Sequence, residues 1–175
     1  THLNDGSPVG NHGTACAGLI RAMAPEVELV SVRVLGPDLK GSAYTFANGP
    51  EWCIDNGVHV VNLSLSTANE DYAETFYELI DQATQRNVMV VSAMKNERKR
   101  SIPSEFAGVF SVACCDGSDP QRFLRNPRPP AQWGALAIDL DGPAVGGVAS
   151  VGAAHILRPG VLHEAEANPR AGAAT

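Results

Sequence analysis

The sequence lacks a long hydrophobic run, an excess of basic residues and any recognisable cysteine pattern. No apolar stretch approaches the roughly 20 residues that a membrane-spanning helix needs, so no such helix is expected. The formal net charge of −6 argues against nucleic acid or an anionic membrane as the main partner. The four cysteines fit neither a zinc site nor a disulfide framework, so we interpret them as unpaired residues, mostly of the core; they are Cys16, Cys53, Cys114 and Cys115.

Nucleotide-binding and targeting motifs are also absent. No Gly-x-Gly-x-x-Gly follows a first strand and no P-loop is present, which disfavours a nucleotide-binding α/β domain. The chain opens on Thr1 without a basic segment followed by an apolar one. We therefore expect no targeting signal, interpret the sequence as a fragment or a processed form, and leave its localisation unknown. The 175 residues are 44% hydrophobic and 18% charged, which is typical of one globular domain with a sizeable core.

Hydrophobic patterns typical of strands and helices alternate along the chain. We predict strands over residues 29–35, 58–65, 88–93 and 109–114, and helices over residues 11–23, about 50–57 and 70–86. This alternation indicates a mostly parallel, twisted sheet with helices on both faces, a three-layer α/β fold. Beyond Asp116 the pattern weakens: the prolines at 120–130 predict a loop, and residues 136–140 a further strand.

His12 lies where a helix should begin. Asn11 is predicted to cap this helix, and small residues behind His12 would let the helix pack closely on a sheet. A histidine held in one orientation suits a general base, whereas a capping or surface histidine is the structural alternative. Cys16 lies one helical turn further on and could share a metal with His12, but nothing nearby supplies the remaining ligands.

With these elements in order, the sequence resembles the subtilisin-like serine proteases. Residues 12–18, His-Gly-Thr-Ala-Cys-Ala-Gly, match the catalytic-histidine motif of that family. Residues 52–66 match its helix and the strand that ends in Ser-Leu, and residues 90–97 resemble the strand leading to its oxyanion-hole asparagine. The likeness covers about residues 5–145. We therefore expect a partial peptidase domain over residues 1–145, followed by a poorly defined tail rich in Ala, Gly and Pro over residues 146–175.

The resemblance implies roles for particular residues. His12 would be the general base, and Asn96 would donate its side-chain amide to the oxyanion. Without the resemblance, Asn96 would be interpreted as a turn residue that follows a strand. One edge of the substrate site would be Ser64, Leu65 and Ser66, and the opposing edge would be Lys40, Gly41 and Ser42. Between these edges a peptide would be held by β-augmentation.

Two parts of the family pattern are not found. Only eleven residues precede His12, and Asp5 lies too close to it to match the catalytic aspartate motif. The segment most similar to the nucleophile motif is residues 150–155, in which a Ser and a His lie five positions apart. This segment lacks the Gly-Thr that precedes the Ser in the family motif, and also its Pro. Ser150 is the resulting nucleophile candidate. Lys95 replaces a glycine that normally lets the backbone approach the substrate.

The resemblance therefore implies a serine-type endopeptidase domain that hydrolyses peptide bonds by acyl transfer and is incomplete in this chain. The alternative is a catalytically inactive pseudo-protease or peptide-binding module. Peptide or protein substrates are the expected partners, with no nucleic acid and no membrane. No cofactor is expected, because the connection over residues 21–27 is too short for the calcium-binding loop of some relatives. The resemblance leaves calcium open elsewhere without identifying a site.

Overall fold

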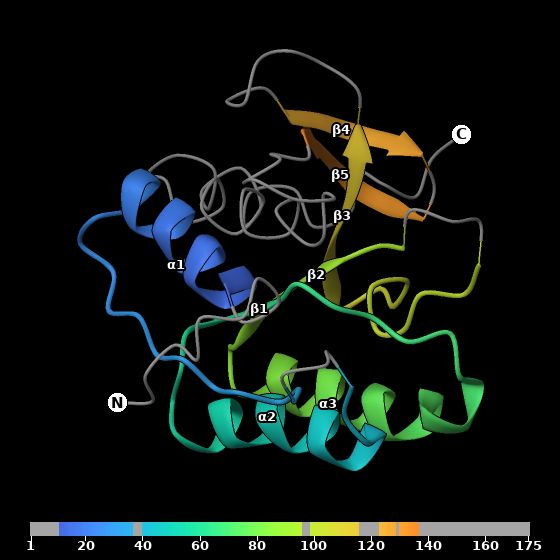
Figure 1. The fold of residues 1–175 in the computed structure, drawn as a ribbon. Coiled ribbons are helices and arrows are strands. Elements are labelled where there is room, and N and C mark those ends of the chain that lie inside the picture. The colour runs from blue at the N-terminus through green and yellow to red at the C-terminus, as the bar shows by residue number, and fades with distance from the viewer. Residues whose placement is uncertain (1–10, 37–39, 96–98, 116–122, 129, 137–175) are drawn as a thin grey trace.

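The computed structural model describes residues 11–36, 40–95, 99–115, 123–128 and 130–136 (Figure 1). In chain order the elements are α1 (Asn11–Met23), α2 (Ala43–Asp55), β1 (Val60–Leu63), the 3-10 helix η2 (Glu70–Tyr72), α3 (Ala73–Gln85), β2 (Met89–Ala93), β3 (Val109–Cys115), β4 (Phe123–Arg128) and β5 (Ala131–Leu136). No helix within the described ranges is both long and apolar enough to cross a membrane.

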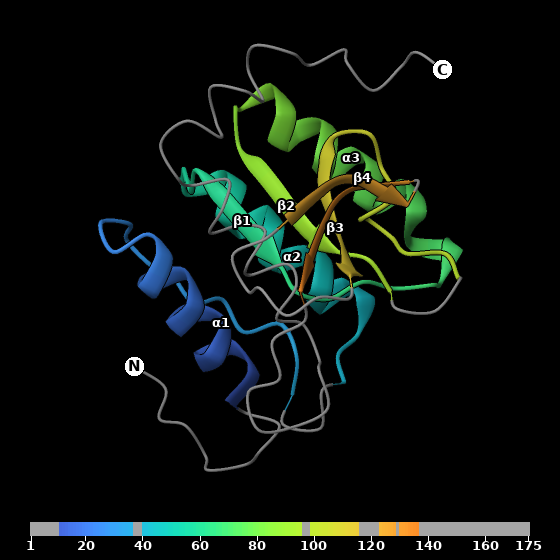
Figure 2. The ribbon, with the colours of Figure 1, turned by 90° about the horizontal axis from the view of Figure 1, so that it is seen from above.

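The described strands form one five-stranded sheet in the order β1-β2-β3-β5-β4. The pairs from β1 to β5 are parallel, and β4 alone runs antiparallel, against β5. Helices α2 and α3 cover one face of the sheet and α1 lies on the other, as the two perpendicular views show (Figures 1 and 2). The predicted three-layer, mostly parallel α/β fold is confirmed.

Two hydrophobic clusters fill the space on either side of the sheet. Because successive side chains of a strand point to opposite faces, Val90 joins the core under α2 and α3, whereas Val91 joins the core on the α1 face. Phe46 of α2 and Phe76 of α3 meet in the first core with ring centroids 4.6 Å apart. Leu19 of α1 packs against the second core. The sheet is therefore covered on both faces, as its Val-rich strands predict.

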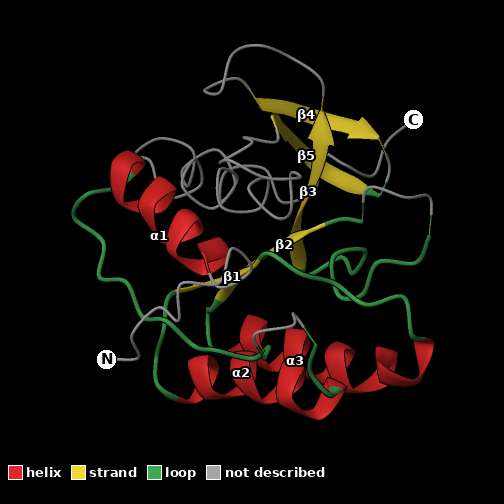
Figure 3. Cartoon of the chain, in the orientation of Figure 1, coloured by secondary structure: helices red, strands yellow, loops and turns green. Residues whose placement is uncertain are grey.

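Most predicted elements are present, with shifted boundaries. The helix over residues 11–23 is confirmed, but it includes Asn11, which is therefore its first residue and not its N-cap. Helix α2 begins at Ala43, well before Pro50, which lies inside it. The side chain of Ser42 accepts a hydrogen bond from the Thr45 amide at 3.1 Å and caps this helix. Figure 3 shows α2 together with α3 as a layer of helices below the strands.

The predicted strand over residues 29–35 is wrong, because this segment is not part of the sheet. Its alternate valines do not all enter a core: Val30 is 52% and Val32 37% exposed. Val34 packs instead against the core on the helical side, and its side chain lies against Gly49 of α2. Among the described strands only β2 pairs with β1, so this extended stretch has no strand partner to make it a β-strand.

The loop predicted from the prolines at 120–130 is also wrong in part, because Phe123–Arg128 forms the edge strand β4. The register of β4 against β5 shifts between Arg125 and Arg128, so the position of Pro127 falls at an irregularity. An edge strand with a bulge tolerates a residue without an N–H. The further strand lies at Ala131–Leu136, earlier than predicted. Residues 137–140 and the expected tail over residues 146–175 lie outside the described residues.

Candidate functional site

His12 lies in the first turn of α1, on the face that this helix turns toward the sheet. His12, Cys16 and Ile20 follow one another at intervals of four residues, so they share one side of the helix. Cys16 and Ile20 are buried, and the side chain of His12 is half-buried at the end of this row. The helix thus carries the imidazole at the margin of the core, in a restrained position that is still open to solvent.

The polar groups around His12 come from its own helix and from the end of β1. Cys16 Sγ lies 3.7 Å from His12 Nε2 and 3.7 Å from Ser64 Oγ. Ser64 Oγ in turn accepts a hydrogen bond from Asn62 Nδ2 at 3.1 Å. The hydrogen bond to Cys16 raises the pKa of His12 above its ordinary value, and partial burial opposes this rise. The structure therefore links the predicted base to the first residue of the predicted substrate edge through the thiol of Cys16.

The predicted edge of Ser64, Leu65 and Ser66 follows directly after β1, at the carboxyl end of a parallel strand. All three residues are half-buried. Leu65 packs on the core under α2 and α3, and its carbonyl accepts a hydrogen bond from Ser92 Oγ at 3.5 Å. This position suits a binding edge, because sites in open α/β sheets gather outside the carboxyl ends of the strands.

The second predicted edge, Lys40, Gly41 and Ser42, is exposed and leads into α2. The Gly36 amide donates to the Lys40 carbonyl at 2.8 Å, which closes the connection before the helix. A Cβ at Gly41 would come within 2.7 Å of the Val34 carbonyl oxygen, so the backbone here passes too close for a side chain. Ser42 acts as the N-cap of α2, a structural role that the sequence analysis did not assign to it.

Two predicted site residues are not placed by the structure. Asn96 and Ser150 lie outside the described residues. Lys95, next to Asn96 in sequence, is described: its amide donates to Ser101 Oγ at 2.9 Å. Sequence reasoning missed Ser101, because its hydroxyl contacts Ser66, 35 positions away in the sequence, and no local pattern marks that contact. It also considered Cys16 beside His12 only as a shared metal ligand and set that role aside, although the one-turn spacing from His12 already signalled a contact.

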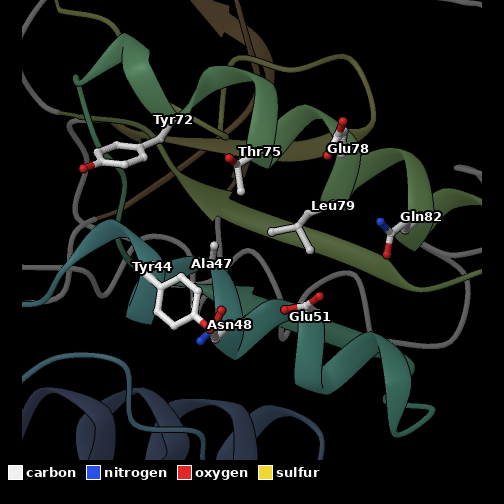
Figure 4. A pocket seen from close by; sticks show the side chains of 9 residues that line it. All are labelled: Tyr44, Ala47, Asn48, Glu51, Tyr72, Thr75, Glu78, Leu79 and Gln82. Atoms are coloured by element: carbon white, nitrogen blue, oxygen red, sulfur yellow. The ribbon is translucent and has the colours of Figure 1, made fainter.

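A separate surface groove lies between α2 and α3 (Figure 4). Its lining residues are Tyr44, Ala47, Asn48, Glu51, Tyr72, Thr75, Glu78, Leu79 and Gln82. These helices cover the face of the sheet opposite to α1, so the groove is distinct from the surroundings of His12. Within the described part of the chain, no group of three or more His, Cys, Asp or Glu side chains could hold a metal ion.

Comparison with known proteins shows the family. The model of the Subtilase family, the S8 peptidases, matches residues 1–162. Subtilisin BL of Lederbergia lenta is 35% identical over 145 residues, which cover 77% of this chain and 51% of that protein. Alkaline elastase YaB of Bacillus sp. strain YaB is 31% identical over 156 residues, covering 83% of this chain and 38% of that protein. The chain thus spans about half the length of the subtilisins that it matches, or less.

Solved structures share the fold at lower sequence identity. A lanthipeptide protease superposes with a TM-score of 0.62 at 17% identity, covering 84% of this chain and 60% of that one. The S218A mutant of the protease domain of PatA superposes with a TM-score of 0.60 at 17% identity, covering 90% of this chain and 66% of that one. The family match, the identities and the shared fold agree. The chain belongs to the subtilase family.

Proposed function

We propose that this chain is part of a serine endopeptidase that hydrolyses peptide bonds by acyl transfer, with His12 as its general base. The observation that carries the proposal is the meeting of His12 on α1, through Cys16, with Ser64 at the end of β1. A base and a peptide-binding strand must converge in this way for a scissile carbonyl to reach the catalytic groups. Membership of the subtilase family supports the same assignment.

In this proposal His12 takes the proton of the nucleophilic hydroxyl as that oxygen attacks the peptide carbonyl, and later returns it to the leaving amine. Ser150 is the proposed nucleophile, and Asn96 donates its side-chain amide to the oxygen that becomes negatively charged. A peptide or protein in extended conformation is the proposed substrate. Its backbone pairs with Ser64, Leu65 and Ser66 on one side and with Lys40, Gly41 and Ser42 on the other. Residues 1–145 are the proposed peptidase segment.

Labelling with a tagged fluorophosphonate, which reacts with activated serine hydroxyls, tests the nucleophile and the base together. Label on Ser150 in the folded chain, with a labelling rate about 10²–10⁴-fold lower in His12→Ala because the base is gone, would support both assignments. His59→Ala is the matched control, since His59 is exposed just before β1 begins, at the opposite end of that strand from Ser64. Equal labelling of both variants would refute the role of His12. A chain that binds peptides but takes no label would be a binding module.

The role of His12 is also tested in a hybrid protein. In this hybrid the chain replaces the segment of subtilisin BL that it matches, about half of that protein, so that the remaining segments come from the relative. Hydrolysis of fluorescein-labelled casein should fall by about 10²–10⁴-fold with His12→Ala and stay unchanged with His59→Ala. A folded hybrid with full activity in His12→Ala would contradict the proposal.

A further inference from the structure

The ends of β1 and β2 are joined by one buried hydroxyl. Ser66 follows β1, Lys95 follows β2, and Ser101 lies between them with 1% of its surface exposed. Ser101 Oγ accepts a hydrogen bond from the Lys95 amide at 2.9 Å and donates one to Ser66 Oγ at 3.1 Å. Ser104 Oγ lies 2.7 Å from the same oxygen. Each serine hydroxyl has one proton: Ser101 gives its proton to Ser66, and Ser104 gives its proton to the Ser101 carbonyl. The bonds to the Lys95 amide and to Ser66 are therefore the two by which Ser101 Oγ joins the strand ends.

The backbone holds Ser101 in this place. The Thr67 amide donates to the Ile102 carbonyl and the Ile102 amide donates to the Thr67 carbonyl, both at 2.8 Å. The Ser101 carbonyl accepts from the Glu105 amide at 3.0 Å and from Ser104 Oγ at 2.8 Å. The hydroxyl therefore cannot swing away from the two strand ends without breaking a local set of hydrogen bonds. The Ser101 hydroxyl therefore holds the two strand ends at a fixed separation.

A side-chain link is needed here because the backbone hydrogen bonds between β1 and β2 end before the proposed binding edge begins. The last paired residues of β1 and β2 are Leu63 and Ser92. Past that pair, the β2 side remains fixed to β3 by the Met94 amide, which donates to the Val112 carbonyl at 2.9 Å. On the β1 side, a weaker link joins Ser92 Oγ to the Leu65 carbonyl at 3.5 Å. The side-chain bond from Ser101 to Ser66 thus extends the fixed spacing to the end of the proposed edge.

We propose that Ser101 is a positioning residue for substrate binding, whose hydroxyl sets the separation of the Ser64–Ser66 edge from the end of β2. This role rests on the proposed function, because it requires a peptide bound along that edge. An extended peptide pairs with a strand only when the backbone groups it meets are held at the right spacing. Loss of the hydroxyl should loosen Ser66 and leave the partly buried Lys95 amide without its acceptor, weakening binding without removing a group that touches the peptide.

The sequence offers a matched control in Ser111. Ser111 is also 1% exposed, and its hydroxyl accepts from the Gln132 amide at 2.9 Å and donates to the Pro130 carbonyl at 3.3 Å. It thus joins β3 to the start of β5 with bonds of the same kind, two strands away from β1, the strand that leads into the proposed edge. Ser111→Ala removes an equivalent buried hydroxyl, so it reports the effect of a merely structural loss.

The experiment measures binding of fluorescein-labelled casein, an unfolded polypeptide of mixed sequence, to the whole chain by fluorescence anisotropy. All variants carry His12→Ala, so that binding is read without cleavage. We expect Ser101→Ala to raise the Kd by about 5-fold or more, as for the loss of one or two net hydrogen bonds, and Ser101→Thr, which keeps a hydroxyl, to restore it within about twofold. Ser111→Ala should leave the Kd within about twofold of the parent. Amide hydrogen exchange should speed up at Lys95 in Ser101→Ala alone.

The possible outcomes separate the two proposals. A parent that binds casein, with Ser101→Ala binding equally well or Ser111→Ala binding equally badly, would overturn the role of Ser101 and leave the proposed function standing. Faster exchange at Lys95 without a change in Kd would show a purely structural hydroxyl and overturn the role as well. A folded parent that binds no casein would overturn the peptide-binding edge, and the role of Ser101 with it.

Discussion

Gly49 of α2 allows a sharp test of where residues 29–35 lie. In a helix interior, replacing glycine by alanine ordinarily stabilises a protein by about 1 kcal/mol. At Gly49, however, the new Cβ would run into Val34 Cγ1, with Val32 Cγ1 at 3.7 Å and Val34 Cβ at 3.8 Å. Valine is stiff about χ1, so it cannot simply turn aside, and such overpacking costs about 1–3 kcal/mol. The two terms together predict that Gly49→Ala changes the free energy of unfolding by about 0 to −2 kcal/mol.

Gly18 of α1 is the matched control, because a Cβ there would meet nothing within 4 Å. Gly18→Ala should therefore show the propensity gain alone, about 1 kcal/mol of added stability. Urea unfolding followed by far-ultraviolet circular dichroism measures both variants under the same conditions. If Gly49→Ala stabilised the chain as much as Gly18→Ala, residues 29–35 would not pack on α2, and our account of why this segment is not a strand would fail.

Three further predictions concern the site and the thiols. Cys16→Ala should lower the pKa of His12, measured by NMR titration of its imidazole, because the hydrogen bond that raises it is gone; an unchanged pKa would contradict the contact. The raised pKa contributes stability below about pH 6.5 that is lost as the pH rises through the folded value, so Cys16→Ala should forfeit this contribution in acid more than in base. Cys114, which is exposed, should react with Ellman's reagent well before Cys53, whose burial raises its pKa; equal rates would argue against this core. In the hybrid with subtilisin BL, Asn96→Ala should lower kcat with little change in KM, since its amide would face the oxyanion only in the transition state; full turnover would make Asn96 a turn residue.

The elements that the sequence predicts well are those whose pattern is local. Helix α3 shows its apolar face through Phe76, Leu79, Ile80 and Ala83, and all four are buried. Strands β1, β2 and β3 are short Val-rich runs between turns, and the structure places each within or close to its predicted range. These patterns succeed because the same residues that form the element also bury it.

The predictions that fail depend on partners far away in the sequence. Residues 29–35 have the composition of a strand, but a strand also requires a neighbour with which to pair, and no local pattern reveals whether one is there. Pro127 signals a loop, yet an edge strand accepts it at an irregular register. At the site, the local motif around His12 predicts a general base. The hydrogen bond from Ser101 to Ser66, in contrast, joins residues 35 positions apart, which only the fold brings together.

The two edges of the described sheet are unlike, and this difference limits how copies of the chain can associate. At one edge, β4 carries Pro127 and an irregular register, features that block continuation of a hydrogen-bond ladder. At the other, β1 has its outer side unpaired by any strand that the structure describes. Among the described strands, β1 is therefore the edge better suited to pairing between copies, and β1 against β1 is an isologous contact that uses the open edge of each copy. A pair of described sheets joined in this way would close at two copies, because its remaining edges are the two β4 strands with their irregular register.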